Sequence, residues 1–322
     1  RADRLSIVGY AQDALAEEYW ASGNVRNNAT ATYLNANLPN SFHISNFESL
    51  RVSDPLVYRQ MSTLSFFASS TIRRNQLLRP FPHMNGLTQA NIPEGDGRTR
   101  SMELSLERRF SRGFSGNVAY TALKGEERFR TLDEFAFPTE FLPTQNGRPH
   151  RLTATGIFEL PLGKGRRYLN GGVLNHAFGG WQIASTYEWQ PGQLLEFPNL
   201  FYYRDPKDIK NSDPTMDRWF NTDGFERNAS LTPAAFHRRV FPLLVEGVRA
   251  QSTNIVSANL TRRFSFSERV NLELRCDVLN IANRSQFNPP NSTPTSTNFG
   301  RITSVIGESI NRMFQLQARL RF

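Results

Sequence analysis

Residues that often do chemistry are present, but their spacing does not form a recognised site. The five histidines are His43, His83, His150, His176 and His237. None of them lies at the spacing of a metal-ligand pair or of an H-E-x-x-H helix, so we interpret them as solvated or turn residues. No G-x-S-x-G sequence occurs, and Gly163-Lys164-Gly165 lacks the upstream glycine and the following Ser or Thr of a phosphate-binding loop. We therefore predict a protein that is not an enzyme and that holds no cofactor or metal.

A segment rich in acids and aromatic residues is the second candidate for a site. Several carboxylates lie between Arg204 and Asp213, and Asp217 and Asp223 follow, but their spacing is not that of a regular calcium loop, so we interpret the segment as solvated. The aromatic side chains of the same segment either bind a sugar or another planar ligand, or fold the loop upon itself. The candidate ligand contacts are Tyr202, Tyr203, Trp219 and Phe220.

Charged residues also alternate strictly with apolar ones near the end of the chain. In FQLQARLRF, residues 314–322, the apolar residues share one face of a strand and the polar residues share the other. Residues 269–278 repeat this pattern. The polar positions of both segments are candidates to line a wet lumen, or they simply pair across strands and stabilise the wall. They are Glu273, Arg275, Asp277, Gln315, Gln317, Arg319 and Arg321.

The elements that must position these residues are long strands. Seven segments have strand-like patterns, at about 100–110, 114–124, 150–160, 180–197, 253–264, 269–281 and 312–322, and residues 4–12 form a possible eighth. Their connections alternate between short, as in Ser111-Arg112-Gly113, and long, as in 198–252 and 282–311. A soluble β-sandwich accommodates the strand pattern, but only an outer-membrane barrel sorts its connections into brief periplasmic turns and long extracellular loops.

The spacing of aromatic residues agrees with a membrane-spanning strand. Trp181 and Trp189 are eight residues apart, as are Phe314 and Phe322. Eight residues of a tilted strand climb roughly 20 Å, which is close to the apolar band of about 25 Å in such barrels. We therefore predict an all-β fold, an antiparallel transmembrane β-barrel portion of about seven or eight long strands.

Composition excludes several other classes of protein. The net charge is +9, from 38 Lys and Arg against 29 Asp and Glu, but the basic residues are dispersed in pairs and no nucleic-acid-binding motif accompanies them. The single Cys276 excludes an intrachain disulfide framework. No run of about 20 apolar residues predicts a membrane helix. The chain starts at Arg1 without an initiator Met or a leader pattern, so we expect a processed chain or a fragment.

Several stretches together resemble the C-terminal barrel half of TonB-dependent outer-membrane receptors, in the Oar-like group that carries a carboxypeptidase-regulatory-like domain. The likeness covers residues from about 70 to the end, in the right order. The stretches that carry it are Gln76–Pro82, Leu104–Gly113, Gly156–Gly165, Gly179–Gln182, Asp217–Thr222, Ser267–Leu272, Asn280–Asn283 with Gln286-Phe287, and the terminal strand.

This resemblance implies a large plugged barrel in the cell outer membrane, energised by the periplasmic TonB complex, that takes up an unidentified extracellular ligand. It also implies that Phe322 is the end signal read by the barrel-assembly machinery. No plug domain and no TonB-contacting segment are recognisable in residues 1–322, which would form the C-terminal part of the barrel. A surface adhesin or structural barrel without transport is the alternative.

The pattern and the resemblance give three structural predictions. Residues 269–281 and 312–322 are antiparallel neighbours, with their leucines on one face and their charges on the other. The turns at 110–114 and 264–269 lie at the same end as Phe322. The chain does not close a barrel alone, because relatives build about 22 strands, and this part would be an open section that aggregates when expressed alone.

Overall fold

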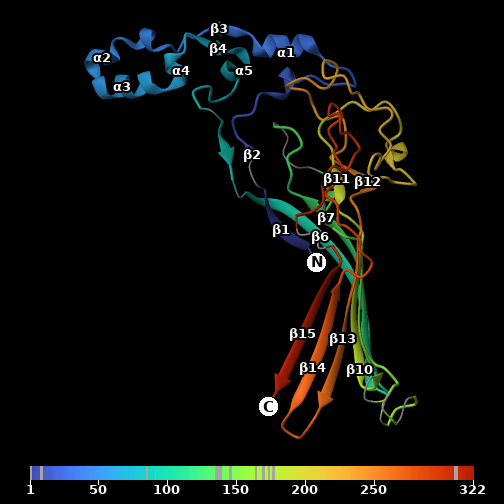
Figure 1. The fold of residues 1–322 in the computed structure, drawn as a ribbon. Coiled ribbons are helices and arrows are strands. Elements are labelled where there is room, and N and C mark those ends of the chain that lie inside the picture. The colour runs from blue at the N-terminus through green and yellow to red at the C-terminus, as the bar shows by residue number, and fades with distance from the viewer. Residues whose placement is uncertain are drawn as a thin grey trace.

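The computed structural model describes the chain except for residues 1, 8–9, 85, 91, 135–139, 145–146, 164, 169–170, 173–174, 176–177 and 308–310. A long single-layer sheet occupies one end of the molecule, and packed loops and short helices occupy the other (Figure 1). Two residues discussed above, Lys164 and His176, lie outside the described part. In the described residues, no helix is both long enough and apolar enough to cross a membrane.

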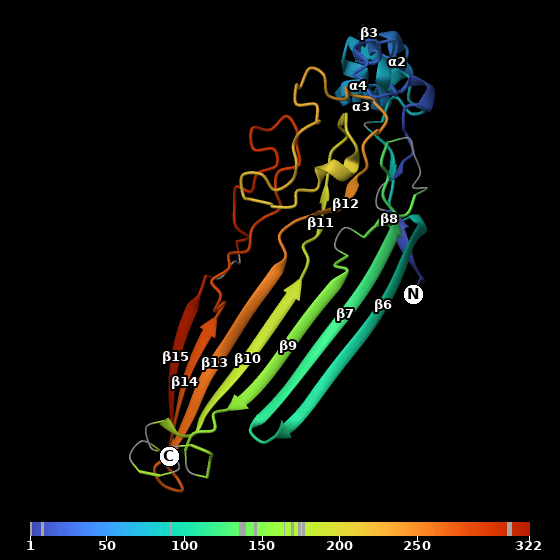
Figure 2. The ribbon, with the colours of Figure 1, turned by 90° about the vertical axis from the view of Figure 1, so that its right-hand side faces the viewer.

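Eight strands form the main sheet, and each pairs antiparallel with its neighbours (Figure 2). In spatial order they are β1 (Ala2–Ile7), β6 (Ile92–Ser111), β7 (Phe114–Arg128), β9 (His150–Glu159), β10 (Trp181–Gln190), β13 (Thr253–Ser265), β14 (Asn271–Leu279) and β15 (Met313–Arg321), and the short β8 (Leu142–Pro143) pairs with β7. The seven predicted segments correspond to the seven strands from β6 to β15 in this order, and the predicted fold class is confirmed. The segment at 180–197 ends its pairing in this sheet at Gln190.

The register places like side chains together across the sheet. Leu272 lies opposite Leu320, Glu273 opposite Arg319, and Arg275 opposite Gln317. Since residues directly opposite each other project to the same face, one face of these strands is apolar and the other is polar. The predicted pairing of the last two strands is therefore confirmed.

The connections sort by length between the two ends of the sheet. β6 joins β7 through Arg112 and Gly113, whose φ angles of 53° and 80° make the tight reversal, and β13 joins β14 through residues 266–270. These turns lie with the end of β15 at the lower end of the sheet in Figure 2, and the long connections lie at the upper end. We call these the turn end and the loop end. The predicted sorting of turns and loops is confirmed.

The described sheet is open. β15 pairs with β14, β1 pairs with β6, and these two strands are the opposite borders of the sheet. Along the outer side of each border strand, the backbone N–H and C=O groups therefore pair with no other strand of the described sheet. The predicted open section agrees with this order, whereas the predicted aggregation stays a prediction.

The connection between β1 and β6 contains helices that the sequence patterns did not predict. Residues 28–77, which we call the helical arm, project sideways from the loop end (Figure 1). Their helices are α1 (Asn28–Asn35), η2 (Ile44–Phe47), α2 (Leu50–Ser53), α3 (Pro55–Thr63), α4 (Ser65–Ala68) and α5 (Arg74–Leu77), joined by the pair β3 (Asn37–Pro39) and β4 (Thr71–Arg73). Leu34, Phe66 and Ile72 are the buried apolar residues among the described residues of the arm.

The remaining long connections pack into a second body. This loop cap comprises the described residues among 10–21, 86–90, 129–149, 191–252 and 280–312. It contains β11 (Leu194–Glu196) paired with β12 (Leu244–Arg249), β2 (Tyr10–Ala11) paired with β5 (Thr88–Gln89), η1 (Glu17–Tyr19) and η3 (Pro206–Ile209). Its buried core consists of Leu195, Phe197, Leu200, Ile209, Phe220, Phe225, Phe241, Val245, Val248 and Phe299.

Candidate functional site: the polar face and the loop cap

The polar face of the sheet brings the charges of six strands onto one surface. Following the register from β6 to β15, this face carries Glu103, Glu107, Arg109, Arg151, Glu159, Glu188, Arg263, Glu273, Arg275, Asp277, Arg319 and Arg321. Between the charges lie small polar residues such as Asn117, Thr155 and Thr186. Such a surface is suited to contact with water and cannot face lipid.

Many of these charges are paired along the wall. The Arg263 guanidinium lies 2.8 Å from the Glu273 carboxylate, and the corresponding distance from Arg275 to Asp277 is 2.7 Å. Arg151 on β9 lies 3.1 Å from Glu188 on β10. The three arginine side chains remain 43–61% exposed, so each pair adds little to the stability of the wall. Three of the predicted lumen residues, Glu273, Arg275 and Asp277, are thus engaged in ion pairs.

The other four predicted lumen residues lie on the border strand β15. Gln315, Gln317, Arg319 and Arg321 face Asp277, Arg275, Glu273 and Asn271 of β14, and all four are exposed. Arg319 stands opposite Glu273, whose carboxylate also accepts from Arg263. The fold therefore unites all seven residues on one face, and their role in lining a lumen stays a prediction.

The opposite, apolar face has the pattern of a lipid-facing surface. Leu104, Val118, Leu260, Leu274 and Leu316 lie on it. Its aromatic residues lie toward the two ends, with Phe114, Phe158, Trp181 and Phe264 toward the turn end and Tyr120, Tyr187, Trp189 and Phe314 toward the loop end. Two aromatic rows that bound an apolar band are typical of a barrel wall in a membrane.

A hollow interrupts the polar face near the turn end. It has a volume of about 700 Å³ and includes Glu107, Arg109, Asn117, Thr155 and Thr186 in its lining. The hollow exists because Ser115, Ala184 and two glycines, Gly116 and Gly156, leave this part of β7, β9 and β10 with little side-chain volume. The long charged side chains of Glu107 and Arg109 on β6 border the hollow on one side.

The four predicted ligand contacts of the loop cap have different surroundings. Phe220 is buried in the cap core, where its ring lies 5.5 Å from that of Phe197, so it offers no surface to a ligand. Tyr202 packs against Phe225, and Trp219 donates its indole N–H to the Arg249 carbonyl at 2.7 Å. Burial is the main cause that raises the pKa of Tyr202.

Of these four, only Tyr203 is an exposed side chain, and its hydroxyl lies 3.2 Å from the Glu226 carboxylate. Burial first, and then this hydrogen bond, raise the pKa of Tyr203. The alternative in which the aromatic residues fold the loop upon itself therefore describes most of this cluster.

The acidic residues of the same loop are divided among separate partners. Asp217 accepts from Arg301, Asp223 accepts from Arg218, and Asp205 caps the backbone N–H of Lys207. Across the described residues, no group of three or more His, Cys, Asp or Glu side chains is placed to hold a metal ion.

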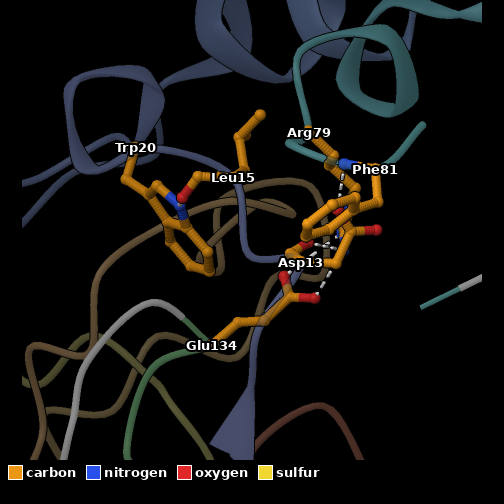
Figure 3. Close-up of polar contacts among 6 residues, drawn as sticks. All are labelled: Asp13, Leu15, Trp20, Arg79, Phe81 and Glu134. Atoms are coloured by element: carbon orange, nitrogen blue, oxygen red, sulfur yellow. Dashed lines mark hydrogen bonds and ion pairs between the residues drawn. The ribbon is translucent and has the colours of Figure 1, made fainter. Parts of the chain in front are cut away.

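Buried Asp13 forms one joint between the loops (Figure 3). Its carboxylate accepts from the Phe81 N–H at 2.8 Å, and its carbonyl accepts from Arg79, also at 2.8 Å. Arg79 in turn reaches Glu134 with distances of 2.9 and 3.3 Å from its two terminal nitrogens. A two-pronged contact of this kind fixes direction as well as distance. It ties the foot of the helical arm to the loop that follows β7.

A second joint connects three loops to the cap core. Arg238 pairs with Glu17, and the Asp133 carboxylate accepts from the Arg239 N–H at 2.9 Å. Burial is the leading cause that raises the pKa of Asp133, and burial also lowers the pKa of Arg239. Arg239 donates to the carbonyls of Phe197 and Phe241, so hydrogen bonds link this joint directly to the backbone of two core residues.

Sequence reasoning missed both joints because their members lie far apart in the chain and each is an ordinary polar residue. Arg79 and Glu134 are 55 residues apart, and Asp133 and Arg239 are 106 apart. The helical arm did offer a local signal. Asp54 followed by Pro55 is a helix start, and the Asp54 carboxylate accepts from the Val57 N–H at 3.1 Å.

Comparison with known proteins adds three findings. A family model described as an outer membrane beta barrel domain matches residues 18–317. The solved structure of the outer membrane transporter YddB from Escherichia coli is similar with a TM-score of 0.37 and 13% identity, over 74% of this chain and 27% of that chain. The chain thus spans little more than a quarter of that transporter's length. No curated protein sequence matches the chain.

Proposed function

The chain belongs to the outer membrane beta-barrel domain family and resides in the outer membrane, and from this premise we propose that it forms part of the wall of a TonB-dependent receptor that takes up a ligand. The observation that carries the proposal is the continuous polar face of an open sheet. A narrow barrel fills its interior with side chains, whereas a wide one encloses a channel or a plug. In the described sheet of eight strands, the two border strands do not pair with each other, and the polar face carries many small and paired side chains. Both features favour a wide interior.

The proposed route of a ligand follows the two surfaces. The loop cap, whose long connections lie on the extracellular side of such barrels, meets the ligand first. The polar face then provides a water-lined path, and three ion pairs neutralise half of the twelve charged residues named on it. A plug and the TonB complex are expected to control passage, and both would act through residues outside this chain. No step of this process requires catalysis, so we propose that the protein is not an enzyme.

The Oar-like membership and the use of Phe322 by the barrel-assembly machinery are further parts of the proposal. They rest on the resemblance of the stretches between Gln76 and the terminal strand. Phe322 is 96% exposed directly after the border strand β15, which pairs with β14 on one side only, so its ring and the outer backbone of β15 are accessible to a partner.

Capture by TonB tests the proposal. The protein, expressed in full and extracted from outer membranes, is passed over immobilised periplasmic domain of TonB, with a porin from the same membranes as the control. Specific retention, together with loss of the protein's phenotype in cells that lack TonB, is expected. Passage of the protein with the porin, and a phenotype that is unaltered without TonB, would overturn it.

A surface adhesin is the second candidate, and the helical arm is the observation that favours it. The arm projects away from the sheet, and Val52, Leu56 and Leu64 on it are 87%, 71% and 53% exposed. An adhesin predicts that cells lose attachment when residues 28–77 are replaced by a short linker, and that TonB is irrelevant to the phenotype.

A further inference from the structure

The apolar face carries an unexpected group of cations at the loop end of β6 and β7. In the pairing of these strands, Arg98 lies opposite Glu126, Arg100 opposite Lys124, Met102 opposite Ala122 and Leu104 opposite Tyr120. Arg98, Arg100 and Lys124 therefore share the face that carries Leu104 and Tyr120, and all three are exposed. They lie directly above the apolar band.

The height of these cations places them among lipid head groups. Lys124 is ten residues beyond Phe114, the aromatic residue at the turn end of the same strand and face. Ten residues of a strand tilted by about 40° climb roughly 25 Å, which is the height of the apolar band of an outer-membrane barrel. Between the band and the cations, the rings of Tyr120 and His150 stack, and the Tyr120 hydroxyl lies 2.7 Å from Nδ1 of His150.

In the described residues, cations outnumber carboxylates on this part of the face, where Arg98, Arg100, Lys124 and Arg128 lie beside Glu126 and Asp96. Lys124 lies 3.1 Å from Glu126, which is the neighbour shared with Arg98. The Arg98 guanidinium instead stacks on the ring of Phe141 at 4.0 Å. Arg100 forms no ion pair within the described residues and stands directly opposite Lys124. Like charges directly opposite each other destabilise a strand pair, so an external anion at this position would relieve the repulsion.

We propose that Arg98, Arg100 and Lys124 form a binding site for the phosphate groups of the glycolipid that fills the outer leaflet of the membrane. The site faces the membrane, lies at the height of the head groups, and presents three cations on adjacent strands beside Glu126, while the next carboxylate on this face, Asp96, is paired with Arg128. Guanidinium groups bind phosphate through paired, charge-assisted hydrogen bonds. This inference goes beyond uptake, because it concerns the lipid contact and is independent of the ligand and of TonB.

Titration with lipid A, a glycolipid that carries two phosphates, tests the site. The protein expressed in full, in detergent, is analysed by native mass spectrometry with lipid A and with lipid A stripped of phosphate. The variants are Arg100→Gln with Lys124→Gln, and, as the matched control, Arg51→Gln with Arg59→Gln, which removes two cations from the helical arm. We expect the first pair to weaken lipid A binding about 30-fold, or about fivefold per cation at an anionic lipid surface.

The control pair is expected to bind within twofold of the unaltered protein, and phosphate-free lipid is expected to bind each variant equally weakly. The charge-conserving pair Arg100→Lys with Lys124→Arg shows whether substitution at these two positions disturbs the fold. It should retain most of the affinity for lipid A. Inorganic phosphate at millimolar concentration should not displace lipid A. Equal lipid A affinity in the first pair and the control, or undiminished binding of phosphate-free lipid, would overturn the proposal.

Discussion

The loop cap and the sheet are stabilised in opposite ways. The cap buries a cluster of phenylalanines around Phe197 and Phe220, as a water-soluble domain does. In β7, β9, β10, β13, β14 and β15 no described apolar side chain is buried, and Leu316 is 80% exposed. The sheet depends on its backbone ladder and on the lipid around it, whereas the cap carries its own core. One chain is thus built for two solvents, and each part should respond to a different kind of substitution.

The largest effect is expected from a cavity in the cap core. Phe220→Ala removes a ring that contacts Phe197, Phe225 and Phe299, and such truncations cost about 3–5 kcal/mol. Limited proteolysis should cut the variant within residues 191–252 far faster than the unaltered protein, with the strand content in circular dichroism unchanged. If the strand signal is lost when the cap unfolds, the stability of the sheet depends on the folded cap.

A charge on the apolar face is expected to have the next largest effect, now on the sheet. Leu260→Arg places a cation between Ile183 and Cys276 within the apolar band, at a cost of about 2–4 kcal/mol near the bilayer midplane. The matched control is Asn259→Arg, which puts the same side chain on the polar face opposite Asp277. Urea unfolding in lipid vesicles measures both. Equal destabilisation by the two variants would contradict the assignment of the faces.

A joint between the loops gives a smaller effect, confined to the boundary of the cap. Arg79→Gln removes the contacts with Glu134 and with the Asp13 carbonyl, and we expect a loss of about 1–3 kcal/mol in local stability. Hydrogen exchange should accelerate at residues 79–81 and 129–134 while the amides of β14 remain protected. Arg73→Gln, which alters an exposed arginine on β4, is the control. Unchanged hydrogen exchange at both joint segments would show that the contacts of Arg79 do not stabilise this boundary of the cap.

The smallest expected effect is a pH dependence of the cap. Burial raises the pKa of Asp133 above its ordinary value of 3.8, so the folded cap binds this proton more tightly than the unfolded chain does. The contribution of Asp133 to cap stability is therefore largest at acid pH and declines as the pH rises through the raised pKa. In Asp133→Asn, which retains an acceptor for the Arg239 N–H, this decline should disappear. An unaltered pH profile of protease resistance in the variant would contradict it.

The two regions also differ in how well the sequence predicted them. In the sheet, alternation at period two is imposed by the two environments, so Leu272 to Val278 and Phe314 to Leu320 identified the strands, their faces and their antiparallel pairing, and the structure adds the individual register partners. The prediction failed where this constraint ends. β6 begins at Ile92 and not near residue 100, because its extension beyond the membrane contains Gly95 and Gly97 and no longer alternates.

Within the cap, the meaning of a residue depends on contacts that no local pattern encodes. Phe220 and Tyr203 have similar neighbours in the sequence, yet one is 1% exposed and the other 56%. What separates them is the contact of Phe220 with Phe197 and Phe299, which come from other parts of the chain. The helical arm escaped prediction because its helices have only four to nine residues, too few for an apolar period to show.

The order of the main strands has a consequence for how barrels of this kind change over generations. From β6 to β15 every long strand pairs with the next long strand in the chain, so no connection crosses another. Duplication or deletion of one hairpin inserts or removes two adjacent strands of the barrel wall and leaves the pairing of all the other strands intact. A lineage can therefore widen or narrow the barrel in steps of two strands while it inherits the same long loops, and barrel width and loop sequence can diverge separately.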